Sequence, residues 1–264
     1  MADTSRVAVL IDCDNISAKA APVIMAETAR HGVLSVKRAY GDFTSSALAA
    51  WRPLLPQLAI QPIQQFPYSK GKNATDSALI IDAMDLLVGT EIDVFCIISS
   101  DSDFTRLAGR LRESGKRVYG IGRKTTPTAF RNACDRFTYL ELLTGEPKDA
   151  DAGGGPAQGT SQELPASVAK PGIADEGDDQ QDDLPLPDLP SLLDAAVRAS
   201  AKDDGWAPLA TVGWYIVNNH PTFDARNYGY PKLGDLVRQL DNIKVETRKD
   251  ATGTGHLWVT LAEQ

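Results

Sequence analysis

The chain has 264 residues and a formal net charge of -8 at pH 7, so it is long enough to form one or two domains with sizeable cores. It has no apolar run of the roughly 20 residues that cross a bilayer, and no basic segment followed by a cleavage site at the start. We therefore expect a soluble, cytoplasmic protein without a membrane partner. The acidic charge does not exclude a polyanionic ligand, because residues 147–190 alone hold ten acidic and two basic side chains.

Residues 1–146 alternate strand-like and helix-like segments, which predicts an α/β fold with an open, doubly wound parallel sheet. The first segment, RVAVLID, is almost continuously apolar, as expected of a strand that is covered on both faces. Pro62 restricts the third strand to an edge of the sheet or to its own first residues. The expected strands are residues 6–12, 33–40, 59–66, 93–99 and 117–122, and the expected helices are residues 18–30, 45–55, 76–88, 103–114 and 128–133.

The middle of the chain, residues 147–190, is rich in Pro, Gly, Asp and Gln. Such a segment buries too little apolar surface to offset its chain entropy, so we expect a disordered linker between domains of residues 1–146 and 191–264. In the second domain, helices are expected at residues 191–202, 209–219 and 230–240, and strands at residues 243–248 and 256–261. Three helices followed by a two-stranded ribbon are the plan of a small winged-helix domain.

The three cysteines, Cys13, Cys96 and Cys134, lie among apolar residues and form no C-x-x-C pair. Their odd number favours buried, reduced thiols over a disulfide framework or a zinc site. The three histidines are widely separated in the sequence and are interpreted as surface or packing residues.

Acidic side chains follow two of the predicted strands. Asp12 ends the first strand, in LIDCDN, and Asp101 and Asp103 follow the strand of residues 93–99. Open parallel sheets bind ligands outside the carboxyl ends of their strands, so these acids are expected at one edge of the sheet. Helix capping is the alternative, because an acid in a first turn also satisfies free N–H groups.

Asp76 is a third source of carboxylate. At helical spacing it lies on the same face as an apolar stripe, formed by Leu79, Ile80, Ala83 and Leu87. A simple partner of the helix dipole is the alternative role for an acid in a first turn. Clustered acids repel one another, and a divalent cation such as Mg²⁺ relieves that repulsion, so we expect the acids to share an ion.

The stretches VLIDCDN, KGKNATDSALIIDA and IISSDSDF resemble, in order and spacing, the motifs of the NYN family, relatives of PIN-domain ribonucleases, over residues 6–143. The resemblance implies a PIN-like fold and hydrolysis of phosphodiester bonds in single-stranded RNA, with Mg²⁺ or Mn²⁺ as cofactor. The four aspartates would bind the metal, with Asp12 and Asp101 as direct ligands, and Asn15 would orient substrate or metal-bound water. The implied catalytic residues are Asp12, Asn15, Asp76, Asp101 and Asp103.

The stretch HPTFDARNYGYPKLGDLVRQL resembles the LOTUS, or OST-HTH, family, which implies a module that binds RNA or docks on a protein. Two rings and two cations close together suit base stacking and phosphate contact, although the tyrosines could instead brace the turn. The candidate RNA contacts in this domain are Arg226, Tyr228, Tyr230 and Lys232. In the first domain the candidates are Lys70, Lys72, Arg123 and Lys124, for which an ordinary surface role is the alternative.

Other functions compete with a ribonuclease. A catalytically silent RNA-binding regulator would carry the same acids and is the main alternative. A haloacid-dehalogenase-like phosphatase would use Asp12 and Asp14, but Asn15 stands where those enzymes usually have Thr or Val. A dinucleotide oxidoreductase is the weakest alternative, because the Gly120-x-Gly122 pair follows the last clear strand and lacks a third glycine.

Overall fold

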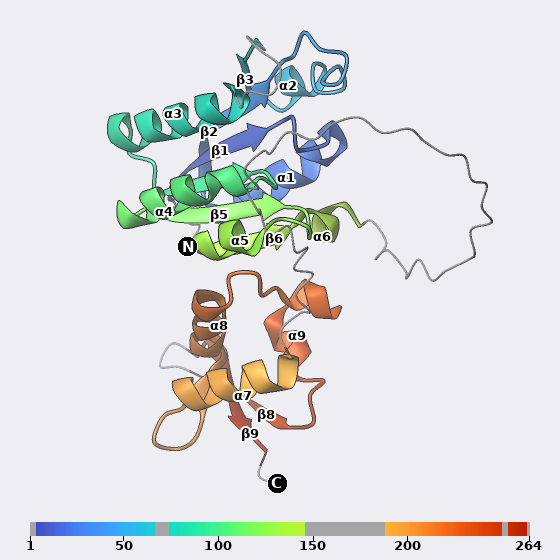
Figure 1. The fold of residues 1–264 in the computed structure, drawn as a ribbon. Coiled ribbons are helices and arrows are strands. Elements are labelled where there is room, and N and C mark those ends of the chain that lie inside the picture. Colours follow the sequence, from blue (N-terminus) through green and yellow to red (C-terminus); the bar gives the residue numbers. More distant parts are fainter. Residues whose placement is uncertain (1–3, 67–73, 146–187, 250–252, 263–264) are drawn as a thin grey trace, which may run out of the picture.

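A computed structural model describes residues 4–66, 74–145, 188–249 and 253–262. Figure 1 shows that they form an N-terminal unit, residues 4–145, and a smaller C-terminal unit, residues 188–262. Lys70, Lys72 and almost all of the segment predicted as a linker lie outside the described residues. None of the described helices combines the length and the apolar character needed to cross a membrane.

The N-terminal unit is a six-stranded parallel sheet with helices on both faces, which confirms the predicted α/β class (Figure 1). The order β3-β2-β1-β4-β5-β6 places β2 and β4 on opposite sides of β1. The carboxyl ends of β1 and β4 therefore form the switch point at which such sheets bind ligands. The strands are β1 (Arg6–Asp12), β2 (Val33–Gly41), β3 (Gln61–Gln64), β4 (Val94–Ile98), β5 (Arg117–Gly122) and β6 (Arg136–Tyr139).

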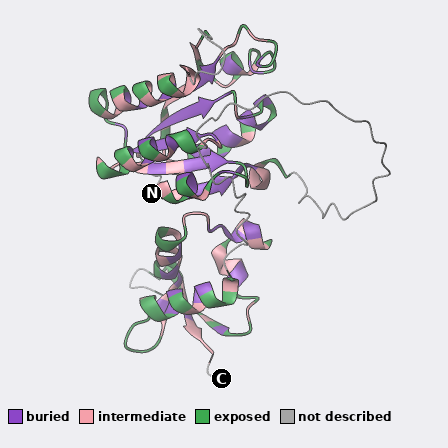
Figure 2. Cartoon of the chain, in the orientation of Figure 1, coloured by how far each residue is buried: buried purple, intermediate pink, exposed green. Residues whose placement is uncertain are grey.

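Two apolar cores lie on the two faces of this sheet. Successive side chains of a strand point to opposite faces, so Val7, Val9 and Ile11 of β1 pack in one core and Ala8 and Leu10 in the other. Figure 2 shows β1 as buried along almost its whole length. Residues of α1 (Ala21–Thr28), α2 (Leu54–Gln57) and α6 (Leu140–Thr144) cover the first face, and residues of α3 (Ala74–Gly89), α4 (Thr105–Glu113) and α5 (Thr128–Ala133) cover the second.

The predicted helix of residues 45–55 is wrong. Of these residues only Leu54 and Leu55 belong to a helix, the four-residue α2, and the preceding residues form turns whose N–H groups donate three residues back, as from Ala49 to Ser46. The Arg52 side chain instead donates to the carbonyl oxygens of the preceding turn, at 2.7–3.0 Å. The third strand pairs only with β2, so Pro62 lies in an edge strand as expected. Strand β6 and helix α6 were not predicted, because each is only four or five residues long.

The C-terminal unit packs helices against a three-stranded antiparallel sheet of order β7-β9-β8. Its first helix begins at Leu189 rather than at residue 191, because Asp188 caps it by accepting the Ser191 N–H. The predicted helix of residues 230–240 is shorter, because the backbone at Lys232 is extended and the helix begins only at Leu233. Gly229, with a left-handed backbone (φ 87°), ends the preceding 3-10 turn, η4. The elements are α7 (Leu189–Ser200), β7 (Ala207–Pro208), α8 (Leu209–Asn219), η4 (Ala225–Tyr228), α9 (Leu233–Val237), β8 (Ile243–Lys249) and β9 (Gly255–Leu261).

The three cysteines are buried and free, as their apolar surroundings predict. Cys13 and Cys96, the latter within β4, pack in the first core of the N-terminal sheet, and Cys134, at the end of α5, packs in the second. Burial raises the pKa of all three thiols well above the usual value, so they are protonated packing groups at neutral pH.

Candidate metal centre

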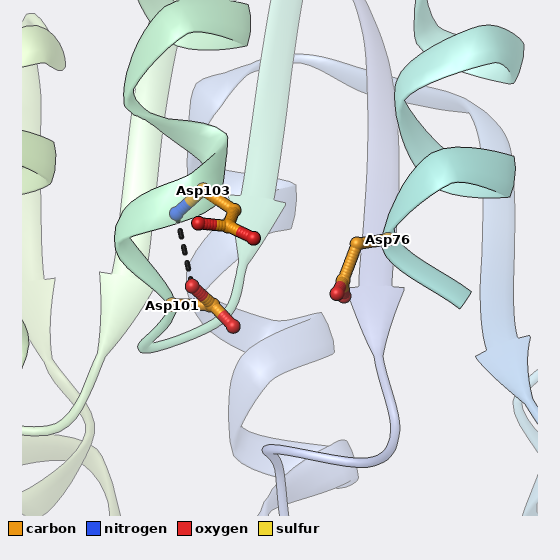
Figure 3. Close-up of side chains that lie close together, drawn as sticks. All are labelled: Asp76, Asp101 and Asp103. Carbon is orange, nitrogen blue, oxygen red and sulfur yellow. Dashed lines mark hydrogen bonds between the residues drawn. The ribbon is translucent and has the colours of Figure 1, made fainter. Parts of the chain in front are cut away.

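Asp101 and Asp103 lie just beyond the carboxyl end of β4, in the turn that leads into α4. Asp101 is the N-cap of the 3-10 turn η3 (Ser102–Phe104), and its Oδ1 accepts the backbone N–H of Asp103 at 2.9 Å. The capping interpretation is therefore right for one oxygen of Asp101. The second oxygen of the same carboxylate stays available for another ligand (Figure 3).

Asp76 reaches this turn from a different element. It lies in the first turn of α3, and Figure 3 shows its carboxylate pointing across the sheet edge toward the other two aspartates. One carboxylate oxygen from each of Asp76, Asp101 and Asp103 lies within 4.8 Å of the others. Oxygen atoms grouped in this way match the ligands that Mg²⁺ and Mn²⁺ prefer.

Asp12 lies at the end of β1, close enough for its charge to act on Asp76. Its side chain is fully buried, and Asp12 is not one of the three acids whose oxygens meet among the described residues. Its Oδ1 accepts the Asp14 N–H at 3.1 Å, while its Oδ2 accepts the Asn15 side-chain amide and the Ser99 hydroxyl, each at 2.7 Å. Three donors thus hold one orientation of the Asp12 carboxylate.

The carboxylates of this site repel one another. Partial burial and the nearby charges of Asp12, Asp101 and Asp103 raise the pKa of Asp76 to about 6. Burial also raises the pKa of Asp12, although hydrogen bonds from Ser99 and Asn15 act in the opposite direction. A cation placed between the carboxylates would remove this repulsion, so the donor set fits a divalent metal ion.

Comparison with known families identifies both units. An NYN domain profile matches residues 6–141, slightly more than half of the chain. The chain belongs to the NYN family. An OST-HTH/LOTUS domain profile matches residues 185–253, after the NYN domain. The protein thus joins a domain of the PIN-like nuclease superfamily to a domain of a family that binds RNA.

Solved structures resemble different parts of this NYN protein. A protein of unknown function from Vibrio parahaemolyticus, VPA0982, is 15% identical with a TM-score of 0.45, over 53% of this chain and 94% of its own. An uncharacterized protein from gene locus NE0665 of Nitrosomonas europaea is 29% identical with a TM-score of 0.28, and the match covers 41% of this chain and 94% of that protein. Residues 175–257 of a Chromobacterium violaceum protein are 36% identical with a TM-score of 0.25, and the match covers 28% of this chain and 78% of that structure. No curated protein matched the chain.

Two residues that were not among the predicted metal ligands, Ser99 and Asp14, also form hydrogen bonds around the site of the NYN domain. The Ser99 hydroxyl donates to Asp12 and accepts the Asp101 N–H at 3.1 Å, so it links β1 to the turn after β4. Asp14 accepts the Thr75 hydroxyl at 2.8 Å and thereby joins the end of β1 to the start of α3. The pairing of Ile11 with Ile98 sets Asp12 beside Ser99, and that register was not available from sequence.

The described basic candidates of the NYN domain lie after β5, whose carboxyl end is at the same edge of the sheet. Arg123 and Lys124 are both exposed. The Arg123 backbone N–H donates to Ser100 at 2.9 Å, which places this turn next to the one that carries Asp101. The Lys124 N–H donates to Glu141 at 3.1 Å.

The candidates of the LOTUS domain lie in three different environments. Arg226 is engaged in ion pairs with Asp224 and Glu27 at 2.7 and 3.0 Å. Tyr228 stacks at a tilt on Phe223, with ring centroids 5.8 Å apart, and both candidate tyrosines pack against the domain core, as the bracing alternative expects. Lys232 is exposed just before α9.

Proposed function

We propose that this protein is a divalent-metal-dependent ribonuclease that hydrolyses phosphodiester bonds of single-stranded RNA, with the LOTUS domain as its RNA-binding module. The observation that carries the proposal is the meeting of Asp76, Asp101 and Asp103 at the switch point of the sheet. These residues come from two helical turns that are separated in the chain by a strand, and membership of the NYN family supports a nuclease.

Asp76, Asp101 and Asp103 would hold the Mg²⁺ or Mn²⁺ ion, and Asp12 would add negative charge nearby. When bound, such an ion polarises the phosphate and supplies an activated water at neutral pH. Ser99 and Asn15 keep the Asp12 carboxylate in place, so that its charge does not turn away from the site. Asn15 is thus assigned a positioning role through Asp12.

The chain's own residues would also bind the substrate. Exposed Arg123 and Lys124 follow β5 at the same edge as the acids and would bind phosphates on either side of the cleaved bond. The LOTUS domain is covalently attached, so RNA bound there has a raised effective concentration at the acidic site.

The direct test is cleavage of a labelled, unstructured RNA by the full chain with added Mn²⁺ or Mg²⁺. We expect Asp12→Asn, Asp76→Asn and Asp101→Asn each to lower the rate by at least about 100-fold, because each removes charge from the site that stabilises the reacting phosphate. Asp85→Asn is the matched control, since Asp85 is an exposed acid on the same helix as Asp76. Equal rates for Asp101→Asn and Asp85→Asn would refute the proposal.

A catalytically silent regulator is the second candidate, and the burial of Asp12 favours it. Asp12 is 0 % exposed, and its three hydrogen bonds use both carboxylate oxygens. A site without a direct Asp12 ligand would bind a metal and RNA with little turnover. RNA binding by the wild-type chain, without cleavage above the Asp12→Asn variant, would establish this alternative.

A further inference from the structure

The NYN and LOTUS domains meet at the edge strand β6. An edge strand exposes N–H and C=O groups that have no neighbouring strand, and proteins often cover such groups. The Phe137 N–H of β6 donates to the carbonyl oxygen of Pro221, in the loop after α8, at 2.8 Å. The LOTUS domain thus satisfies a backbone donor that the sheet itself leaves unpaired.

A chain of alternating charges lies next to this hydrogen bond. Glu27 of α1 is only 5 % exposed and accepts two hydrogen bonds from Arg226 of the LOTUS domain, at 3.0 and 3.3 Å. Arg226 also pairs with Asp224 at 2.7 Å, and Asp224 pairs with Arg136 of β6 at 3.1 Å. Two acids and two arginines therefore alternate across the domain boundary.

The buried acid depends on its partner from the other domain. Burial alone would raise the pKa of Glu27, but the hydrogen bonds and charges of Arg226 and, to a smaller extent, of Arg30 outweigh burial and lower it. Asp224 prepares Arg226 for this contact, because it accepts both the Arg226 backbone N–H at 2.9 Å and its Nε at 3.0 Å. A guanidinium fixed in this way loses little side-chain entropy when it binds a carboxylate.

The space between the domains is loosely filled. One cavity of about 200 Å³ is lined by Asn132 and Asp135 of the NYN domain and Asn218 and Asn219 of the LOTUS domain. A second, of about 340 Å³, lies beside Arg226. Because the boundary is polar and incompletely packed, its specificity comes from the charged contacts more than from apolar burial, as in interfaces that open reversibly.

We propose that the β6 edge together with Glu27 is a docking surface of the NYN domain, that its occupant is the LOTUS domain of the same chain, and that Arg226 is the residue it recognises. Docking and RNA binding through Arg226 exclude each other, since one guanidinium cannot serve two carboxylates and a phosphate together. This last step rests on the RNA binding proposed above, whereas docking itself does not.

Distance measurement between two spin labels in the full chain tests the docking. Glu113→Cys on α4 and Ala201→Cys after α7 supply exposed attachment points, and the three native thiols are buried. We expect a single narrow distance for the otherwise wild-type chain. Glu27→Gln and Arg226→Gln should each lower the ratio of docked to open protein by about tenfold or more, because each removes the ion pair that joins the two domains at this point.

The double variant Glu27→Gln/Arg226→Gln should open the chain less than the product of the two single effects, as expected of residues that contact each other. Arg198→Gln is the matched control, since its exposed pair with Asp194 lies within α7. A broad distance distribution in the wild-type protein, or single variants that remain as narrow as Arg198→Gln, would overturn the docking surface.

Addition of an unstructured oligouridine tests the exclusion step. We expect the narrow distance to broaden as the RNA binds, with binding followed separately by fluorescence anisotropy. Bound RNA with an unchanged distance would refute the mutual exclusion of docking and RNA binding. The docking measurements made without RNA would still stand. Absence of RNA binding would instead count against the proposed function and leave the docking result unaffected.

Discussion

At the scale of single residues, burial determines which charges the fold holds. Burial raises the pKa of Asp12 and Asp76, and it acts on basic groups in the opposite direction. His31 shows this in the 3-10 turn that follows α1, η2 (Ala29–His31), where the centroid of its ring lies 4.3 Å from that of the Tyr119 ring. Burial, together with the charge of Arg136, lowers the pKa of His31 to about 4.

This shift predicts that stability falls in acid. The pKa of His31 in the fold, about 4, lies below its ordinary value of 6.5, so the unfolded chain binds the proton first. The free energy of unfolding should therefore decrease as pH falls from about 6.5 to about 4, by at most about 1.4 kcal/mol per pH unit. Chemical denaturation at several pH values, compared with His31→Phe, isolates this contribution from those of acids such as Glu27. Parallel curves for the two proteins would contradict it.

At the scale of elements, the glycines of β5 determine how closely the second face of the sheet packs. A Cβ at Gly122 would lie 2.7 Å from the Thr126 hydroxyl, 2.9 Å from the Phe137 ring and closer still to the Ser99 carbonyl oxygen. The pair of glycines considered for a dinucleotide fingerprint thus has a packing role. Gly109 of α4 differs, because a Cβ there would meet no atom within 4 Å.

Two glycine substitutions should therefore act in opposite directions. Gly122→Ala should lower the free energy of unfolding by about 1–3 kcal/mol, because it overpacks the turn that carries Ser99, and it should also slow RNA cleavage. Gly109→Ala should raise the free energy of unfolding by about 0.5–1 kcal/mol through helix propensity alone, and it should leave the rate of RNA cleavage unchanged. Urea denaturation and the RNA assay measure both variants. Loss of stability in Gly109→Ala, or none in Gly122→Ala, would show that packing of these elements is misassigned.

At the scale of the whole molecule, the NYN sheet and the LOTUS domain have separate cores. Two apolar clusters cover the faces of the NYN sheet, and a third lies wholly within the LOTUS domain. The acidic site belongs to the NYN domain alone. A ligand of that site should therefore stabilise one part of the molecule directly.

Calorimetry with Mn²⁺ tests this division. At a concentration of about 100 times its dissociation constant, the ion should raise the free energy of unfolding of the NYN domain by about 2.7 kcal/mol. The midpoint temperature of that transition should rise by about 5–10 °C. The LOTUS transition should move little, and a chelator should reverse the effect. Asp101→Asn should abolish the shift, whereas Asp85→Asn should retain it. An equal shift in Asp101→Asn would place the ion elsewhere.

The sequence by itself determined the fold class, the families of both domains and which acids follow which strands. Apolar continuity, helical spacing and motif order are local properties, so RVAVLID and the stripe containing Leu79 were sufficient for these predictions. Short elements such as β6 have too few residues for a pattern. The segment before Pro53 was misassigned because its backbone forms successive turns, which the Arg52 side chain stabilises by donating to the carbonyl oxygens of Phe43, Thr44 and Ser45.

Only the tertiary structure decided which charges meet. The register of β1 against β4 sets Asp12 beside Ser99, whose hydroxyl donates to the buried Asp12 carboxylate. Contact between distant segments likewise gives Arg226 two carboxylate partners, one of them 199 residues away in the chain. The energies of these charges depend on burial and on neighbours from other segments, and neither quantity is encoded in any single stretch of sequence.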